Sequence, residues 1–105
     1  MSQSFSEFEA DARGQGFDEV LERRWEPLTV LDVHAHPFDA KAIVVCGEMW
    51  LTVGDDTRHL RSGDTFELDR DIAHSERYGS EGATYWVARR GAAPTSPASE
   101  RVQPC

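Results

Sequence analysis

The sequence is poor in cysteine and in basic residues, and it contains no long apolar run. Its two cysteines, Cys46 and Cys105, are too few for a disulfide framework, and we expect Cys46 to be buried in an apolar strand. Lysine and arginine number 11 against 19 aspartates and glutamates, and the net charge of −8 disfavours nucleic acid and anionic membrane surfaces as partners. No stretch approaches the roughly eighteen apolar residues of a membrane-spanning helix. The first residues lack the basic and apolar regions of a secretory signal, so we expect a cytoplasmic protein.

A short helix is predicted at the N-terminus. Ser4 and Glu7 form a capping-box pattern, in which a hydroxyl is followed three residues later by a glutamate. Apolar residues follow at helical spacing, and glycines at 14 and 16 stop the pattern. These signals predict a helix over residues 5–13 that covers one end or one face of the domain.

From residue 17 onward the pattern changes to that of β-strands. Short runs of β-branched and aromatic residues alternate with turn residues at regular spacing. We expect Gly47 to turn the chain, and Gly79 and Gly82 to bracket another turn. The expected strands cover residues 19–25, 29–36, 42–46, 49–53, 57–60, 65–68, 73–78 and 84–88. This spacing predicts an all-β fold, an antiparallel jelly-roll barrel with a short N-terminal helix.

A length of 105 residues is typical of one domain with a modest core. We expect residues 1–16 to form the N-terminal helix and lead-in, and residues 17–90 to form the barrel. Residues 91–105 are rich in proline, alanine and serine without an apolar pattern, so we expect them to be disordered.

Three histidines are the strongest functional signal. His34 and His36 are two residues apart, so on a strand both side chains point to the same face. His74, from a distant strand, can complete a set of three imidazole ligands for a divalent metal. We predict that these three residues bind one divalent transition metal, and the ligand set leaves iron, nickel, zinc and manganese open. His59 lies in another strand, and we expect it at the surface.

At this point the sequence resembles the small single-domain cupins, whose barrels are described as RmlC-like. The first cupin motif runs G-x5-H-x-H-x(3,4)-E-x6-G and the second G-x5-P-x-G-x2-H-x3-N. The matching residues are His34, His36 and Gly47 in the first motif, and Gly63 and His74 in the second. The resemblance covers about residues 25–88 and implies a jelly-roll barrel with a metal at its mouth.

One ligand of the family is missing from this chain. The glutamate of the first motif falls at Ala40, or at Lys41 with a one-residue slip, and neither can be a carboxylate ligand. The resemblance therefore implies the three-histidine variant. That variant is found in cupin thiol dioxygenases and diketone-cleaving oxygenases, which use ferrous iron without a protein carboxylate.

Two other carboxylates are candidates for a role at the site. Asp39 lies three residues after His36, close to the missing glutamate, and could reach the metal or a bound water, or lie in a solvated turn. Glu76 lies two residues after His74 and so faces the same side of a regular strand. It could be a fourth ligand or a general base; otherwise a bulge turns it to solvent or it pairs with a nearby arginine.

The pocket beside the metal is expected to be partly apolar. Met49, Leu51 and Phe66 should point into the barrel together with Glu76, which predicts a small, partly hydrophobic ligand. The three tryptophans at positions 25, 50 and 86 are many for the surface of a small acidic domain. They suggest a homodimer interface, or packing under the N-terminal helix.

Two functions remain open at this stage. One is a metal-dependent enzyme, such as a small-molecule oxygenase, in which Asp39 or Glu76 adjusts protonation. The other is a non-catalytic module that binds or senses a small ligand and dimerises, as in regulators resembling the AraC type. The barrel alone cannot distinguish them, because one fold hosts many functions.

Overall fold

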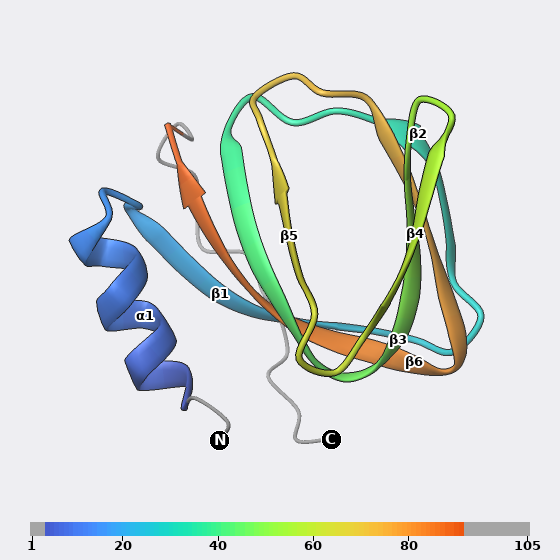
Figure 1. Cartoon of the computed structure of the whole chain (residues 1–105), viewed down its shortest axis with the longest axis horizontal. Coiled ribbons are helices and arrows are strands. Elements are labelled where there is room, and N and C mark those ends of the chain that lie inside the picture. Colours follow the sequence, from blue (N-terminus) through green and yellow to red (C-terminus); the bar gives the residue numbers. More distant parts are fainter. Residues whose placement is uncertain (1–3, 92–105) are drawn as a thin grey trace.

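The computed structural model describes residues 4–91 and contains one helix and six strands. The elements are α1 (Phe5–Gly14), β1 (Glu19–Trp25), β2 (Val30–His34), β3 (Asp39–Val53), β4 (Asp56–Arg61), β5 (Thr65–Leu68) and β6 (His74–Arg90). All strand pairs are antiparallel. Figure 1 shows the strands curving around a central space with α1 outside them, so the predicted all-β fold with one short helix is confirmed.

Two long strands hold the barrel together. The first part of β3 and the last part of β6 pair with each other between β1 and β5. The last part of β3 and the first part of β6 pair with each other between β2 and β4. Because β3 and β6 each contribute to both layers, the sheet is folded over on itself, which is the jelly-roll arrangement.

The glycines expected to turn the chain instead let the long strands continue through irregular points. Gly47 lies inside β3 with φ +79°, at a register shift between β3 and β6. A Cβ atom on Gly47 would lie 2.2 Å from the carbonyl oxygen of Gly82. Gly82 lies inside β6 with φ +72°, and a Cβ there would lie 2.2 Å from the carbonyl oxygen of Trp25. The predicted breaks at Gly47 and between Gly79 and Gly82 were therefore wrong, since these sites are close crossings of three strands.

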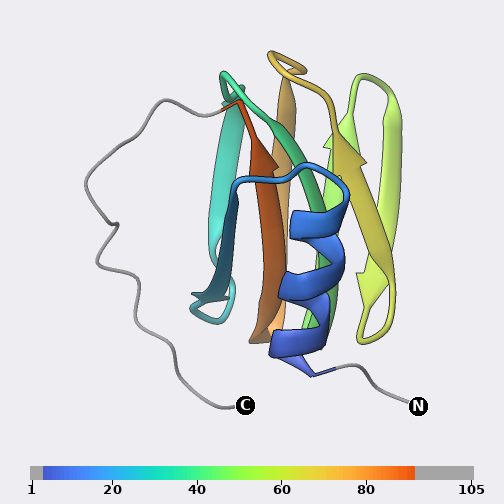
Figure 2. The ribbon, with the colours of Figure 1, turned by 90° about the vertical axis from the view of Figure 1, so that its left-hand side faces the viewer.

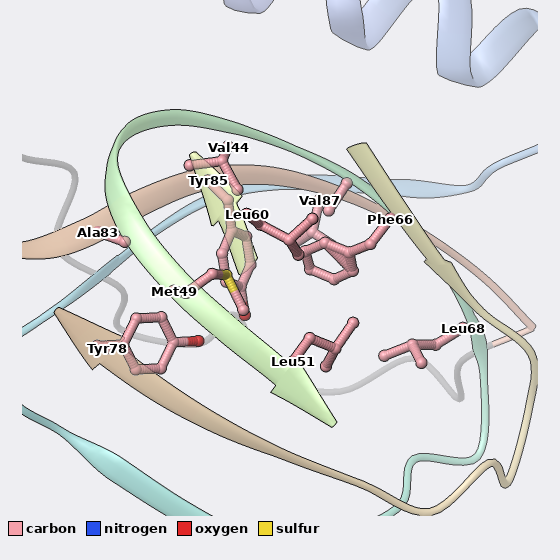
Figure 3. Close-up of a cluster of buried hydrophobic side chains, with 11 residues drawn as sticks. Val44, Met49, Leu51, Leu60, Phe66, Leu68, Tyr78, Ala83, Tyr85 and Val87 are labelled. Carbon is pink, nitrogen blue, oxygen red and sulfur yellow. The ribbon is translucent and has the colours of Figure 1, made fainter. Parts of the chain in front are cut away.

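The core fills the space between the two layers. Figure 3 shows its side chains pointing toward one another from β3, β4, β5 and β6. Its labelled members are Val44, Met49, Leu51, Leu60, Phe66, Leu68, Tyr78, Ala83, Tyr85 and Val87. Met49 and Leu51 are almost fully buried in this core. Four of its members, Phe66, Leu68, Tyr85 and Val87, also line the cavity described below.

The N-terminal helix packs on the outside of the barrel, as Figure 2 shows. The predicted capping box is present, because Ser4 and Glu7 exchange side-chain-to-backbone hydrogen bonds of 2.9 and 3.1 Å. Phe8 is buried against the sheet, and the ring of Phe5 meets Trp86 edge-on at 5.5 Å. The helix ends at Gly14, one residue later than predicted. At ten residues it is too short to cross a membrane, and it is the one helix in the described part of the chain.

Two further predictions concern Cys46 and the C-terminal residues. Cys46 is only half-buried, so the prediction that it is buried was wrong. The expected disordered tail lies outside the described residues from position 92 onward, and the division of the chain at residues 16 and 90 stays a prediction.

Candidate metal centre

The three predicted histidines meet at one end of the barrel. His34 is the last residue of β2 and pairs directly with His74, the first residue of β6. His36 follows in the loop before β3, which crosses the same end of the barrel as the loop before β6 (Figure 1). One ligand atom from each of the three side chains lies within 4.8 Å of the others. The sequence spacing therefore found a real cluster, although β2 ends before His36, which lies in a loop and not on a strand.

Backbone carbonyls fix two of the imidazole rings. The Nδ1 atom of His34 lies 2.7 Å from the carbonyl oxygen of Asp32, and that of His74 lies 3.0 Å from the carbonyl oxygen of Ile72. A carbonyl oxygen only accepts hydrogen bonds, so Nδ1 carries the proton in both rings. Each ring therefore presents Nε2 to the interior, which is the orientation of a metal-binding histidine supported by a backbone carbonyl.

The third ring is held by aromatic packing. His36 stacks on Phe38, with ring centroids 4.9 Å apart and planes 15° apart. Its centroid lies 4.9 Å from that of His34 and 5.3 Å from that of His74. Burial lowers the pKa of His36, and the neighbouring His34 and His74 lower it further. The neutral imidazole, which is the form that binds metals, is therefore favoured at this position.

Glu76 is the buried carboxylate of the site. Its Oε2 atom lies 3.3 Å from Nε2 of His34 and 3.3 Å from Nε2 of His74. Its Oε1 atom accepts a hydrogen bond from the hydroxyl of Tyr78. The side chain is only 6% exposed, so Glu76 faces the interior and is not turned to solvent by a bulge.

Glu76 and His74 each stabilise the charged form of the other. Burial raises the pKa of Glu76, but the hydrogen bonds with His74 and Tyr78 outweigh this effect and bring the pKa below its ordinary value. The hydrogen bond with Glu76 raises the pKa of His74, against the opposite effect of burial. The site thus holds an ionised carboxylate between imidazoles.

This donor set fits a divalent transition metal. Ligand atoms about 2.0–2.2 Å from one tetrahedral ion lie about 3.3 Å apart. The two distances from Glu76 Oε2 to histidine Nε2 atoms have this length. Three imidazole nitrogens and one carboxylate oxygen are also a ligand type that zinc, iron and nickel accept. The residues that could hold the ion are His34, His36 and His74.

Asp39, the other carboxylate candidate, is not brought to the site. Its Oδ1 atom accepts a hydrogen bond of 2.8 Å from the backbone N–H of Arg70, and its Oδ2 atom lies 3.5 Å from Nε of Arg90. It is not among the residues that line the cavity described below. Asp39 instead fastens the loop after β5 to the start of β3.

A cavity of about 290 Å³ opens beside the histidines, between the two layers of the barrel. Two of the predicted pocket residues, Phe66 and Glu76, line it, whereas Met49 and Leu51 belong to the core and do not. Its lining consists of Arg23, Trp25, Leu31, His34, His36, Phe38, Ala40, Phe66, Leu68, His74, Glu76, Tyr85, Val87 and Arg89. The cavity is therefore apolar on most sides, with the histidine cluster, Glu76 and two arginines among its polar groups.

The two arginines were not predicted as site residues. Arg89 lies two residues after Val87 and four after Tyr85 along β6, so all three share one face of the strand. Arg23 lies two residues before Trp25 on the neighbouring strand β1 and pairs with Tyr85. Strand alternation was the signal that could have found them, but an arginine on an inner face contradicts the usual apolar pattern.

The remaining histidine lies at the surface, as predicted. His59 Nε2 is 2.7 Å from Oε1 of Glu48, and its ring stacks on Trp50 at 4.5 Å. Both contacts lie on the outer face of the sheet, away from the cluster. His59 therefore offers a natural control for experiments on the other three histidines.

Comparison with known proteins finds matches among solved structures but none among family models or curated proteins. An RmlC-like cupin from Shewanella frigidimarina has a TM-score of 0.60 at 21% identity, covering 69% of this chain and 65% of its own length.

Two enzyme structures match in the same way. A chain of the DMSP lyases RdDddP and RnDddQII has a TM-score of 0.64 at 22% identity, covering 70% of this chain and 38% of that one. Oxalate decarboxylase OxdC from Bacillus subtilis has a TM-score of 0.65 at 20% identity, covering 73% of this chain and 22% of that one. The chain therefore spans less than two thirds of the length of these proteins. At these identities the likeness shows the fold, which is the predicted cupin jelly roll, and the histidine cluster fits the predicted three-histidine site.

Proposed function

We propose that this cupin-fold chain is a metal-dependent enzyme that acts on a small molecule. One divalent transition metal would be bound by His34, His36 and His74, with Glu76 as the fourth ligand from the protein. The observation that carries the proposal is the position of Glu76, whose buried Oε2 atom lies 3.3 Å from two inward-facing Nε2 atoms. A bound divalent cation would supply Lewis acidity at the mouth of the cavity.

The energetic cost of Glu76 supports a functional role. Burying an ionised carboxylate is expensive unless it is paired and hydrogen-bonded, and an apolar residue of similar volume usually packs there at less cost. The chain keeps the carboxylate and surrounds it with Tyr78, His34 and His74. Clusters of this kind, next to a cavity, are typical of functional sites.

The other residues of the site would position and enclose the ligand. The carbonyls of Asp32 and Ile72 hold two imidazoles with Nε2 inward, and Phe38 holds the third by stacking. Leu31 and Phe66 would exclude water from the cavity. Glu76 also separates this site from the carboxylate-free oxygenase type that the sequence resemblance implies, so the reaction need not be an oxygenation. Oxalate decarboxylase and DMSP lyases share the fold, which supports a bond-cleaving enzyme equally well.

The first experiment measures metal binding. Apo protein is titrated with Zn²⁺ and with Fe²⁺ under anaerobic conditions, and bound metal is counted by elemental analysis after gel filtration. We expect one equivalent in the wild type, loss of binding in His74→Ala, and weaker binding in Glu76→Gln. His59→Ala, which removes the surface histidine, should bind like the wild type.

Two results would contradict the proposal. One is a wild-type protein that takes up no metal while circular dichroism shows it folded. The other is equal loss of metal in His59→Ala and His74→Ala, which would mean that uptake does not depend on the cluster. Retention of metal with wild-type affinity in Glu76→Gln would refute the fourth ligand alone.

A second candidate function is the non-catalytic binding of a small ligand. The observation that favours it is the mostly apolar cavity, which can hold a ligand whether or not chemistry follows. A binding module should hold its ligand equally well with zinc or iron, because zinc has no redox chemistry. Turnover of a candidate ligand by the metal-loaded protein, absent in His74→Ala, would decide for the enzyme.

We also propose a homodimer, although the tryptophans that suggested it from the sequence do not form an exposed face. Trp86 packs against α1, and Trp25 stacks on Tyr78 and lines the cavity, so these rings are not an open face. The most exposed large apolar side chains are instead Leu28, Val30 and Val33, which lie in or just before β2 and are 71%, 64% and 71% exposed. Light scattering should give a dimer for the wild type and a shift toward monomer for Val30→Glu. A monomeric wild type at high concentration would refute the dimer.

A further inference from the structure

We propose that the cavity binds the carboxylate group of a small organic acid, with Arg89 as the residue that recognises it. This proposal names the substrate class of the site above and so rests on the proposed function. The acid would enter the cavity with its carboxylate on Arg89, opposite the metal-binding histidines. Its apolar part would lie against the aliphatic and aromatic lining.

Arg89 carries an unsatisfied hydrogen-bond donor. The Nε atom of Arg89 is buried and has no hydrogen-bond partner among the described residues. A buried donor without a partner costs about 1–3 kcal/mol, and such an atom in a native structure calls for an explanation. Arg89 lines the cavity, so a ligand oxygen in the cavity would satisfy it.

The same cavity contains a second donor of this kind. The Nε1 atom of Trp25 is buried, and its one neighbouring acceptor, the hydroxyl of Tyr85, lies at a geometry too poor for a regular hydrogen bond. Both atoms can only donate. These are the two buried side-chain atoms left unsatisfied in residues 4–91, and both belong to the lining of one cavity. The ligand that fits them carries acceptor oxygens.

Arg89 is also held in place by its neighbours. Its guanidinium carbon lies 4.8 Å from the ring centroid of Phe38, and its Nη1 atom lies 3.4 Å from Oε1 of Glu19. The pair with Glu19 is at the long end of an ion pair, so it restrains one end of the guanidinium without using its other donors. Phe38 also stacks on His36, so one aromatic ring connects the arginine with the histidine cluster. Arg89 is thus held against the aromatic ring that also stacks on His36.

The charge of the cavity differs from that of the chain. The chain carries a net charge of −8, but the cavity lining contains Arg23 and Arg89 against Glu76 alone. A divalent metal on the histidines would make the cavity more positive still. An anion is therefore attracted into this cavity although the protein as a whole repels anions.

The size and lining of the cavity restrict the acid further. A volume of about 290 Å³ is at the lower end of ligand pockets, which span about 300–1,000 Å³. Leu68, Val87 and Phe66 offer an apolar surface to the rest of the molecule. A guanidinium binds a carboxylate through two parallel hydrogen bonds, which favours a planar carboxylate as its ligand. The geometry points to a monocarboxylic acid with a short apolar body.

The test is direct binding of named acids, with a readout that does not depend on turnover. Isobutyrate and benzoate, and their neutral amides isobutyramide and benzamide, are titrated by calorimetry into the Zn²⁺-loaded wild type and into the apo protein. Three variants are compared with the wild type: Arg89→Gln, Arg89→Lys and Arg90→Gln. Arg90 is the matched control, because it is the next residue of β6, is exposed and contacts Asp39 and Phe17 outside the cavity.

We expect at least one of the two acids to bind the wild type and its amide to bind much more weakly. Arg89→Gln should weaken binding of the acid at least about tenfold, Arg89→Lys should weaken it less, and Arg90→Gln should leave it unchanged. Circular dichroism and zinc content of each variant show whether the fold and the metal site are intact. If Arg89→Gln does not fold, Arg89→Lys becomes the test variant, and its affinity for the acid must be lower than that of the wild type.

Three results would overturn the proposal. They are the absence of binding by either acid, equal binding of acid and amide, and wild-type affinity in a folded Arg89→Gln variant. Failure of the metal site gives a different pattern. In that case zinc does not bind, yet the acid still binds the apo protein in a manner that depends on Arg89. The two claims can therefore fail separately.

Discussion

Replacing Gly47 by alanine should destabilise the fold far more than its place inside a strand suggests. Gly47 has φ +79°, which costs an L-residue with a Cβ about 1–2 kcal/mol. The added Cβ would also lie 2.2 Å from the carbonyl oxygen of Gly82 and 2.7 Å from Cα of Ala83. Both are backbone atoms of β6, so relief requires moving that strand away from β3.

The expected magnitude follows from these two effects. Forced overpacking of a well-packed interior typically costs about 1–3 kcal/mol. Together with the left-handed backbone this predicts a loss of about 3 kcal/mol or more for Gly47→Ala. Gly54→Ala is the matched control, because Gly54 has φ +60° in a hairpin and a Cβ there would meet nothing within 4 Å. The control should lose only the backbone contribution of about 1–2 kcal/mol.

Urea unfolding and thermal unfolding, each followed by circular dichroism and tryptophan fluorescence, measure both variants under identical conditions. With about 4–8 °C of melting temperature per kcal/mol for a domain near this size, a loss of about 1–2 kcal/mol means that Gly54→Ala should melt about 4–16 °C below the wild type. Gly47→Ala should melt more than about 12 °C below it, or fail to fold. The reasoning is refuted if the two variants lose the same free energy of unfolding, because the crossing of β3 and β6 would then have no steric cost.

Two further predictions concern groups near the cavity. Tyr78→Phe removes the buried hydroxyl that donates to Glu76, so in EDTA it should lower the free energy of unfolding by about 1.5–3 kcal/mol, as expected for a hydrogen bond to a charged group; an unchanged urea midpoint would contradict this. The backbone N–H of Arg70 holds the pKa of Asp39 below its ordinary value of 3.8, so the ionised form stabilises the fold above that pH and the contribution is lost as the pH falls. Asp39→Asn should therefore be less stable than the wild type near neutral pH, and the difference should shrink as the pH is lowered through and below 3.8; a constant difference across this range would show that its charge is not involved.

The histidine cluster was predictable because its signals are local. Two histidines two residues apart share a face whatever the rest of the chain does, and the spacing to His74 matched a known motif. The N-terminal helix was predictable for the same reason, since the capping box of Ser4 and Glu7 needs only four residues. The inward direction of Glu76 also followed from strand alternation, although its two imidazole contacts did not.

The misplaced breaks at Gly47 and Gly82 arose from contacts between distant segments. Glycine within an apolar run is read as a turn, but here each glycine makes room for the backbone of another strand. Nothing in the neighbouring sequence shows that Gly82 and Trp25 touch. Arg89 was missed as a cavity residue for a related reason. Its role depends on an acceptor that residues 4–91 do not provide.

The first strand, β1, pairs with β6, the last of the described strands, so the barrel cannot close before β6 is present. Glu19 of β1 pairs with Arg89 of β6, 70 residues later, and a fold dominated by such distant pairings forms in milliseconds to seconds instead of microseconds. His74 begins β6 and Arg89 lies near its end. The histidine cluster and the arginine side of the cavity therefore depend on the same strand, and neither is complete until β6 has paired with β2 and β1. Assembly of the histidine cluster thus reports that this strand has taken its place in the barrel.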